Sequence, residues 1–262
     1  MSSSSLSQFS SIVVNPESPK FYGPIHEVWE IIHQKILSYD YTKILDVGPG
    51  SMPFPYATHS IDFCSSSSLP NFEICNIEFD KFPFPDKFFD FVYCRHVLED
   101  LNNPFHCISE MQRVSKNGYI ETPNPLTEIS RYPSSTEEQK SDIMLRGYIH
   151  HRWFVWVSED NVLSFFPKYS YIENKNCFLL SQKLEHSIET QLKNDLMSWN
   201  TYYFWTNEIT WKCYQNGKDY VMIKNINDKL FDVFNNIYFK MINEGQQNKN
   251  NMYQQIQKLF QK

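Results

Sequence analysis

The sequence lacks a Cys-x-x-Cys pair, because its 6 cysteines are scattered along the chain. Neither a zinc site nor a disulfide framework is indicated, so we expect no bound metal and reduced, mostly buried thiols. No run approaches the roughly 18 apolar residues that a membrane span needs, and the N-terminus has no secretory-signal pattern. These absences predict a cytoplasmic protein that does not enter a membrane.

A run of Lys or Arg is also missing. The chain holds 24 Lys and Arg against 30 Asp and Glu, a formal net charge of −6. An acidic chain is a poor candidate for gripping a phosphate backbone, so no nucleic-acid partner is expected. Aromatic side chains, by contrast, make up 16% of the residues. They bury large areas and favour packed surfaces or an aromatic-lined pocket.

The order of the predicted elements indicates an α/β fold. Apolar residues at helical spacing predict a helix over 25–39 and another over 97–115. Short β-prone runs predict strands at 43–48, 59–63, 72–78, 88–94 and 118–123. Strands separated by helices or crossovers predict a Rossmann-like, doubly wound sheet that is mostly parallel.

Beyond the fifth strand the pattern changes twice. The run "HRWFVWVSEDNVLSFFP" predicts an antiparallel hairpin at the sheet edge. From 183 the chain reads as mainly helical, with a small hairpin around Asn216-Gly217 as an alternative. We therefore expect a flexible N-terminal tail over 1–24, a main domain with a cap helix over 25–182, and a mainly helical C-terminal extension over 183–262.

The stretch "ILDVGPGSMPFP" at 44–55 places two glycines after the first strand. Open parallel sheets bind ligands beyond the carboxyl ends of their strands, and glycine lets the backbone approach a ligand closely. Asp62, ending the second strand, is placed to take both hydroxyls of a ribose, and Asn76 to bond an adenine edge. Pro53 replaces the last glycine of a G-x-G-x-x-G motif, which favours a nucleoside without a phosphate chain.

The run "ILDVGPG … HSID … EICNIEFDKFPFPDKFFDFVYCRHVLEDLNNP … KNGYIETPNP" resembles class I S-adenosylmethionine-dependent methyltransferases. It is most similar to the small-molecule branch whose fourth motif has the form "FPDxxFDxVxxxHVLEH". The resemblance covers roughly residues 40–125 and implies S-adenosyl-L-methionine as the cofactor. Two positions depart from the family: Met52 stands where a third small residue is usual, and Asp100 where His is usual. We attach no consequence to the second.

The resemblance also implies which residues hold the cofactor. They are Asp46, Gly48 and Gly50 for the methionine part, Asp62 for the ribose hydroxyls, Asn76 and Ile77 flanking the adenine, and Cys94 and Arg95 along the cofactor after the fourth strand. From the residues alone, other readings stay open. The glycines fit an ordinary strand-to-helix turn, Asp62 a strand-end cap, and Asn76 a turn residue.

An alcohol nucleophile must lose its proton as it takes a methyl group, and a histidine or a carboxylate suits that task. The candidate bases are His151, His150 and His96, in that order. Glu121, which ends the fifth strand, is a candidate for orienting an acceptor hydroxyl. Structural readings stay open: a solvated turn for His150-His151, backbone bonding for His96, and an amide bond for Glu121.

The acceptor is predicted to be a small molecule. "CRHV" stands where an Asn-Pro-Pro-Tyr-type tetrapeptide would grip a flipped base, which disfavours base methylation. The relatives suggested by "GYIETPNP … HRWFVW" favour O-methylation of a sugar, as a nucleotide-sugar or glycan, in polysaccharide biosynthesis. Alternatives are a lipid, quinone or protein acceptor, a degenerate fold that only binds or scaffolds, and an NAD-dependent enzyme. A homodimer is a further expectation.

Overall fold

A computed structural model of the chain describes residues 25–64, 69, 71–130, 146–158, 160–169, 182–214, 243–244, 247–252, 254 and 258. The expected tail over 1–24 and the alternative hairpin around Asn216-Gly217 lie outside the described residues. Among the helices of the described part, none combines the length and the apolar character needed to cross a membrane.

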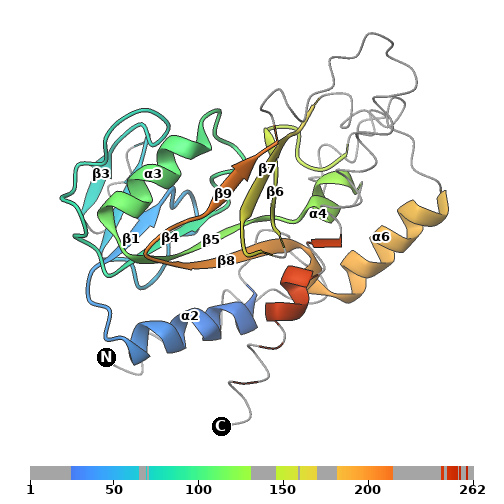
Figure 1. Cartoon of the computed structure of the whole chain (residues 1–262), viewed down its shortest axis with the longest axis horizontal. Helices are drawn as coiled ribbons and strands as arrows, with labels where there is room; N and C mark the ends of the chain where they lie inside the picture. The colour runs from blue at the N-terminus through green and yellow to red at the C-terminus, as the bar shows by residue number, and fades with distance from the viewer. Residues whose placement is uncertain are drawn as a thin grey trace.

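A six-stranded sheet forms the centre of the molecule (Figure 1). Its strands are β1 (Ile44–Val47), β2 (His59–Asp62), β3 (Phe72–Ile74), β4 (Phe91–Arg95), β5 (Asn117–Pro123) and β8 (Asn200–Thr206). The spatial order is β3-β2-β1-β4-β5-β8, and every neighbouring pair is parallel except β5 with β8. The predicted Rossmann-like, mostly parallel sheet is confirmed. Its strand order reverses between β1 and β4, the switch point at which such sheets bind ligands.

Helices cover the two faces of this sheet. The predicted N-terminal cap helix is α2 (His26–Ser38), and its apolar face packs with Tyr93 and Tyr119 of β4 and β5. Helix α3 (Pro104–Val114) lies on the opposite face, where Ile108 packs with residues of β1 and β4. Figure 1 shows the two helices on either side of the sheet. The core is therefore layered, as a doubly wound sheet requires.

The predicted start of α3 at residue 97 was wrong by several residues. The helix begins at Pro104, and the Asn103 side chain accepts a hydrogen bond from the His106 N–H. Proline is favoured in the first turn of a helix because its missing N–H has no partner there. Residues 97–103 instead form turns, and these turns carry site residues described below.

A second sheet contains the predicted hairpin. β6 (Trp153–Val157) and β7 (Leu163–Pro167) pair antiparallel, and β9 (Trp211–Cys213) pairs parallel with β7. The hairpin was predicted correctly, but its place at the edge of the main sheet was wrong. Both strands are buried throughout, so each face needs cover. One face packs into the α3 core, and the other against α4 (Pro125–Ile129) and α6 (Gln182–Asn194).

Strand β8 supplies the antiparallel edge of the main sheet. The expected helical extension is correct for α6 and for the short helix η2 (Leu196–Ser198), but wrong for Asn200–Thr206. The run "NTYYFWT" pairs with β5, so that Phe204 lies opposite Tyr119 with ring centroids 4.8 Å apart. Aromatic residues favour such cross-strand pairs. The main sheet therefore continues past the expected boundary at 182, while the domain limits themselves stay a prediction.

Candidate cofactor and acceptor site

The two glycines after β1 both adopt the left-handed backbone region, with φ of 66° at Gly48 and 49° at Gly50. The Gly48 N–H donates to the Ile61 carbonyl at 2.9 Å, which ties the turn to β2. A Cβ at Gly48 would lie 2.5 Å from Val97 Cγ2, whereas a Cβ at Gly50 would meet nothing within 4 Å. Gly48 is thus needed for close packing, and Gly50 borders open space.

The turn after β1 lies beside the carboxyl ends of its neighbouring strands. Val47 pairs with Ile61 on β2 and with Cys94 on β4, so Asp62 and Arg95 stand at the level of Gly48. Asp62, the residue predicted to bind the ribose, and the glycine turn therefore lie at the same edge of the sheet.

Asn76 follows β3 at the same edge. Its side chain is exposed and accepts a hydrogen bond from the Glu78 N–H at 3.1 Å, while its own N–H donates to Asp80. The Cys75 N–H donates to the Asp62 carbonyl at 2.9 Å, which holds this loop against the end of β2. Asn76 is thus a turn residue in the present structure, and its loop lies next to Asp62, the residue predicted to bind the ribose.

Asp46 is buried under the proline-containing loop. Only 2% of it is exposed, and its Oδ2 accepts a hydrogen bond from the Phe54 N–H at 2.6 Å. The Phe54 ring stacks on Tyr93 with centroids 4.0 Å apart, so the loop is packed down on the sheet. Burial raises the pKa of Asp46 to about 7, although the Phe54 hydrogen bond opposes the rise. Asp46 therefore changes charge near neutral pH.

Two predicted cofactor residues turn their side chains into the core. Ile77 and Cys94 belong to the buried cluster under α3, and a hydrogen bond with Cys107 together with burial raises the pKa of the Cys94 thiol well above its usual value. Only their backbone groups remain for a ligand. Phe63 was not predicted, yet its ring is 70% exposed directly after Asp62. An aromatic residue following a strand-end acid was the available signal.

Arg95 and Glu121 pair across β4 and β5. The Arg95 Nε donates to Glu121 Oε1 at 3.1 Å, and both side chains are buried. Glu121 also accepts hydrogen bonds from Asn200 Nδ2 at 2.6 Å and from the Tyr119 hydroxyl at 2.5 Å. With its oxygens bonded to protein donors, Glu121 fits a structural role better than contact with an acceptor hydroxyl.

His96 sits at a tight bend between the two halves of the site. Its φ is 52°, and its N–H donates to the Glu121 carbonyl at 2.9 Å. The imidazole Nδ1 lies 3.2 Å from Glu99 Oε1, and Nε2 lies 3.9 Å from Glu121 Oε1. Burial and the nearby Arg95 charge hold the pKa of His96 well below its usual range. The ring is therefore neutral at neutral pH and only weakly basic.

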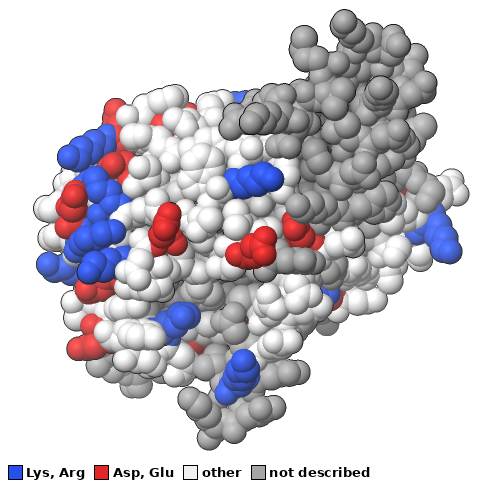
Figure 2. All heavy atoms as spheres, in the orientation of Figure 1, with Lys and Arg blue, Asp and Glu red and all other residues white. Residues whose placement is uncertain are grey.

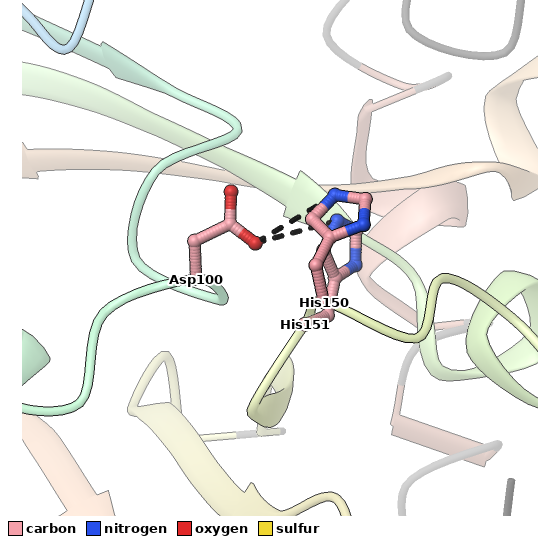
Figure 3. A group of neighbouring side chains, drawn as sticks. All are labelled: Asp100, His150 and His151. Atoms are coloured by element: carbon pink, nitrogen blue, oxygen red, sulfur yellow. Dashed lines mark ion pairs between the residues drawn. The ribbon is translucent and has the colours of Figure 1, made fainter.

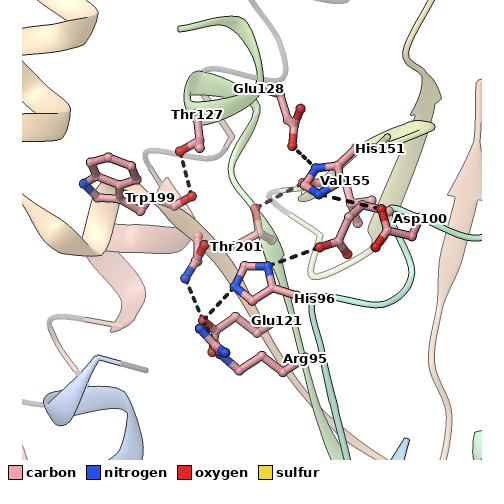
Figure 4. Close-up of polar contacts among 12 residues, drawn as sticks. Arg95, His96, Asp100, Glu121, Thr127, Glu128, His151, Val155, Trp199 and Thr201 are labelled. Atoms are coloured by element: carbon pink, nitrogen blue, oxygen red, sulfur yellow. Dashed lines mark hydrogen bonds and ion pairs between the residues drawn. The ribbon is translucent and has the colours of Figure 1, made fainter. Parts of the chain in front are cut away.

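His151 is held by a buried ion pair, as Figure 4 shows in part. Its Nδ1 hydrogen-bonds Glu128 Oε1, and Glu128 Oε2 accepts from Lys168 Nζ at 2.6 Å. Burial alone would raise the pKa of Glu128, but Lys168 and His151 outweigh it and lower that pKa to about 2. An ionised carboxylate thus fixes the ring, whose Nε2 lies 3.7 Å from Asp100 Oδ1.

The predicted histidines meet around the turn after β4. His150 is exposed, and its Nε2 lies 3.9 Å from the same Asp100 oxygen that faces His151. The Arg152 N–H donates to the Glu99 carbonyl at 2.6 Å, which holds the histidine segment against this turn. The structure therefore joins His96, through Glu99, to the histidine pair in one polar network.

The sequence analysis missed the acidic and basic partners in this network. These residues are Glu99, Asp100, Glu128 and Lys168. Asp100 carried a signal, since it replaces the family's usual His, but no consequence was drawn from it. Glu128 and Lys168 lie on α4 and directly after β7, and only the fold brings them together.

Charged side chains of both signs intermingle on the face of the molecule drawn in Figure 2, mainly toward the end that carries β3 and α3. Among the described residues on this face, neither sign forms an extended patch. The distribution gives this face no broad field of one sign.

Comparison with known families gives one match. A family model described as "Methyltransferase domain" matches residues 58–120, which run from the start of β2 into β5. That segment includes Asp62, Asn76 and Arg95. No curated protein gives a match.

Comparison with solved structures gives partial matches. An S-adenosylmethionine-dependent methyltransferase from Mesorhizobium loti is 15% identical, with 34% of this chain and 50% of that chain covered and a TM-score of 0.28. A SAM-dependent methyltransferase from Aquifex aeolicus is 24% identical, with 35% and 64% covered and a TM-score of 0.28. The chain thus spans half of the first structure and less than two thirds of the second.

Proposed function

We propose that this chain, which carries a class I S-adenosylmethionine-dependent methyltransferase domain, transfers the cofactor's methyl group to a sugar hydroxyl. The methyl-transfer part of the proposal is carried by the family match over β2 to β4, in which Asp62 and Arg95 end the two strands that flank β1. That match supports the predicted family resemblance and the predicted cofactor, S-adenosyl-L-methionine. The roles of single residues and the acceptor are proposals.

The residues at the switch point fit the cofactor. Gly50 borders open space next to the turn, and Asp62 ends the neighbouring strand, which supports its proposed role in binding the ribose hydroxyls. The exposed Phe63 ring offers an apolar face for a purine. Asp46, once ionised, would pair with the ammonium of the methionine part. Arg95 is committed to Glu121 by its Nε.

When bound, the cofactor supplies a methyl group already activated on a sulfonium. Transfer is an in-line displacement in which the carbon–sulfur bond breaks as the oxygen–carbon bond forms. The chain must align the acceptor oxygen and accept its proton, and alignment is worth up to about 7–11 kcal/mol in the best cases.

His151 is the proton acceptor that the geometry supports best. Glu128 holds its Nδ1, which directs Nε2 toward the exposed side chains of Asp100 and His150. His96 is less suitable because its low pKa makes it a weak base. The acceptor hydroxyl would therefore bind near the turn after β4 and give its proton to His151 Nε2.

Cofactor binding is tested by calorimetry with S-adenosylhomocysteine. Asp62→Ala is expected to abolish binding, and Glu27→Ala, on the exposed side of α2, to leave it unchanged. If the unaltered protein shows neither a binding isotherm nor stabilisation at high ligand excess, the chain is a binding or scaffold module instead. If Asp62→Ala binds normally, the ribose assignment is wrong.

The acceptor is tested with methyl-labelled cofactor and a panel of nucleotide-sugars, glycans, lipids, quinones and peptides. We expect label in a sugar fraction, and His151→Gln is expected to lower the rate by about 10²–10⁴-fold. His26→Gln, exposed at the start of α2, is the matched control. Label only in another class of acceptor would replace the sugar assignment.

A further inference from the structure

The geometry points to a binding site for one divalent transition-metal ion, formed by Asp100, His150 and His151 (Figure 3). Each residue offers one ligand atom, and these atoms all lie within 4.8 Å of one another. Asp100 Oδ1 is 3.9 Å from His150 Nε2 and 3.7 Å from His151 Nε2. The sequence analysis expected no metal because it considered only cysteine pairs.

The three atoms are close to coordination distance. Zinc-type bonds of about 2.0–2.1 Å in a tetrahedral site separate ligand atoms by roughly 3.3 Å. The two separations that involve Asp100 are about 0.4–0.6 Å wider than this tetrahedral value, and the two histidine nitrogens lie within 4.8 Å of each other. The side chains of His150 and Asp100 are 62% and 41% exposed, so both have room to turn inward. His151 is buried and fixed, and it therefore anchors the site.

The surroundings of His151 are those of a metal ligand. Its Nδ1 is bonded to the carboxylate of Glu128, which Lys168 holds in turn. Metal-binding histidines almost always donate their other ring N–H to such a group, because this fixes the tautomer and the ring orientation. The second ring nitrogen, Nε2, is left facing Asp100.

Asp100 supplies an independent observation. Its Oδ1 is buried and has no hydrogen-bond partner among the described residues, although the rest of the side chain reaches solvent. A buried carboxylate oxygen without a donor is costly, and a cation would satisfy it. Glu99 Oε2, one residue earlier, is likewise buried without a hydrogen-bond partner in the described part of the chain.

The backbone holds the ligands in place before any ion arrives. The Arg152 N–H donates to the Glu99 carbonyl at 2.6 Å, and Trp153 Nε1 donates to the Leu101 carbonyl at 2.7 Å. The two acceptors lie immediately before and after Asp100, and the two donors immediately follow the histidine pair. The arrangement is thus built by the fold rather than by chance approach of surface side chains.

The donor set selects the class of ion. Two imidazole nitrogens and one carboxylate oxygen suit Zn²⁺, Co²⁺, Ni²⁺ or Fe²⁺, whereas Mg²⁺ and Ca²⁺ prefer oxygen ligands alone. Three protein ligands also leave a position open for water or another oxygen, as in catalytic zinc sites.

The metal site goes beyond the proposed function and does not depend on it. A metal ion on His151 Nε2 would occupy the lone pair that otherwise accepts the hydroxyl proton. Histidine base catalysis and metal binding therefore exclude each other at this atom. An oxygen bound at the open position would instead ionise more easily, because a bound metal lowers its pKa.

The test is titration of the full-length, untagged protein with Co²⁺, followed by calorimetry and by visible absorption. We expect one Co²⁺ per chain, with an absorption band of nitrogen- and oxygen-ligated cobalt. Asp100→Asn and His150→Ala are each expected to weaken binding roughly tenfold or more. His26→Ala, which removes an exposed histidine of α2, should not change the affinity.

Urea denaturation of the same variants serves as the folding control, and it keeps this test apart from that of the proposed function because it needs no cofactor binding. Both variants alter partly exposed side chains, so they should still fold. Binding of Co²⁺ weaker than roughly 1 mM would overturn the proposal. Equal affinity in the two variants and the unaltered protein would overturn it as well, since the metal would then sit elsewhere.

Discussion

Single residues at the switch point differ in what they can tolerate, and the two glycines of the first turn show this most directly. Both have positive φ, which other L-residues adopt at a cost of about 1–2 kcal/mol. Only Gly48 is also crowded, because Val97 occupies the space where its side chain would lie. Gly48 is therefore a packing position, and Gly50 a conformational one.

Gly48→Ala is expected to lower the free energy of unfolding by about 2–5 kcal/mol, the sum of the backbone term and an overpacking term. Gly50→Ala should cost only the backbone term, so it is the matched control. Urea denaturation measures both. Adding Val97→Ala should restore part of the loss at Gly48 but nothing at Gly50. Equal losses for the two glycine variants would contradict this account.

The sequence suggests candidate site residues where their chemistry alone identifies them, and the roles of these residues stay predictions. A carboxylate at the end of a strand, such as Asp62, and a nearby glycine pair indicate from the sequence the edge of the sheet at which a ligand is expected to bind. The direction of a side chain is harder to predict, because neighbouring strand residues point to opposite faces. Cys94 and Arg95 are adjacent, yet the first packs under α3 and the second pairs with Glu121. A shift of one position changes the role completely.

Among the elements, strand β8 approaches β5 very closely at one position of the main sheet. Gly118 on β5 lies opposite Trp205 on β8. A Cβ at Gly118 would lie 2.6 Å from the Trp205 ring and 2.6 Å from the Val92 carbonyl. The indole therefore uses the space that the glycine leaves empty, and β8 docks closely on β5.

Gly118→Ala is expected to destabilise the protein by about 1–3 kcal/mol, because the indole or the strand must shift. Denaturation followed by tryptophan fluorescence measures the loss. In a Trp205→Ala background the ring clash disappears, so the alanine should cost less there. An undiminished cost in that background would assign the effect to the Val92 backbone contact instead.

A second contact between elements joins α4 to the end of β7. Glu128 and Lys168 form a buried ion pair, and both also contact the segment that carries His151. Removing one partner leaves an uncompensated buried charge, which costs about 3–5 kcal/mol. The pair therefore determines how firmly the histidine segment is held.

Glu128→Gln and Lys168→Met are each expected to lower the free energy of unfolding by about 3–5 kcal/mol. The double variant should lose less than the sum, because neither charge then remains buried alone. Chemical denaturation of the three variants gives the coupling energy. A strictly additive result would mean that the two side chains do not stabilise each other.

The elements themselves were predicted unevenly. Strands β1 to β5 and the β6–β7 hairpin were recognisable because each is a short β-prone run bounded by turn residues. Strand β8 was missed because its run "NTYYFW" follows a helical pattern without a strong break, and aromatics suit either structure. Its partner, β5, lies some 80 residues earlier in the chain. Pairing with this distant strand makes Asn200–Thr206 a strand rather than a helix, and the local sequence pattern does not indicate such pairing.

At the scale of the whole molecule, the two sheets and α3 share one hydrophobic core. The edge that carries the predicted cofactor residues belongs to the first sheet, and His151 lies two residues before the first strand of the second. Packing between the sheets therefore sets the distance between the carboxyl edge of the first sheet and the segment that carries His151. The roles of the two sides stay predictions from the sequence, which did not predict the contacts of His96 with Glu99 and of His151 with Asp100.

The ionisation of Asp46 links the stability of the whole molecule to pH. Burial raises its pKa from 3.8 to about 7, so the folded protein holds a proton that the unfolded chain releases. Its contribution to stability is fully present below pH 3.8 and is lost as the pH rises to about 7. At about 1.4 kcal/mol per pKa unit, the loss is roughly 4 kcal/mol.

Asp46→Asn should remove this slope, because an amide does not ionise but still accepts the Phe54 N–H. Denaturation between pH 4 and pH 8 measures it in both proteins, and parallel curves would contradict the assignment.

The ammonium of the cofactor's amino-acid part favours ionised Asp46, so ligand binding should release a proton below about pH 7. Affinity for S-adenosylhomocysteine should then rise up to tenfold per pH unit and level off above that pH. Calorimetry in two buffers of different ionisation enthalpy counts the proton directly, and a count of zero at pH 6 would separate Asp46 from the cofactor.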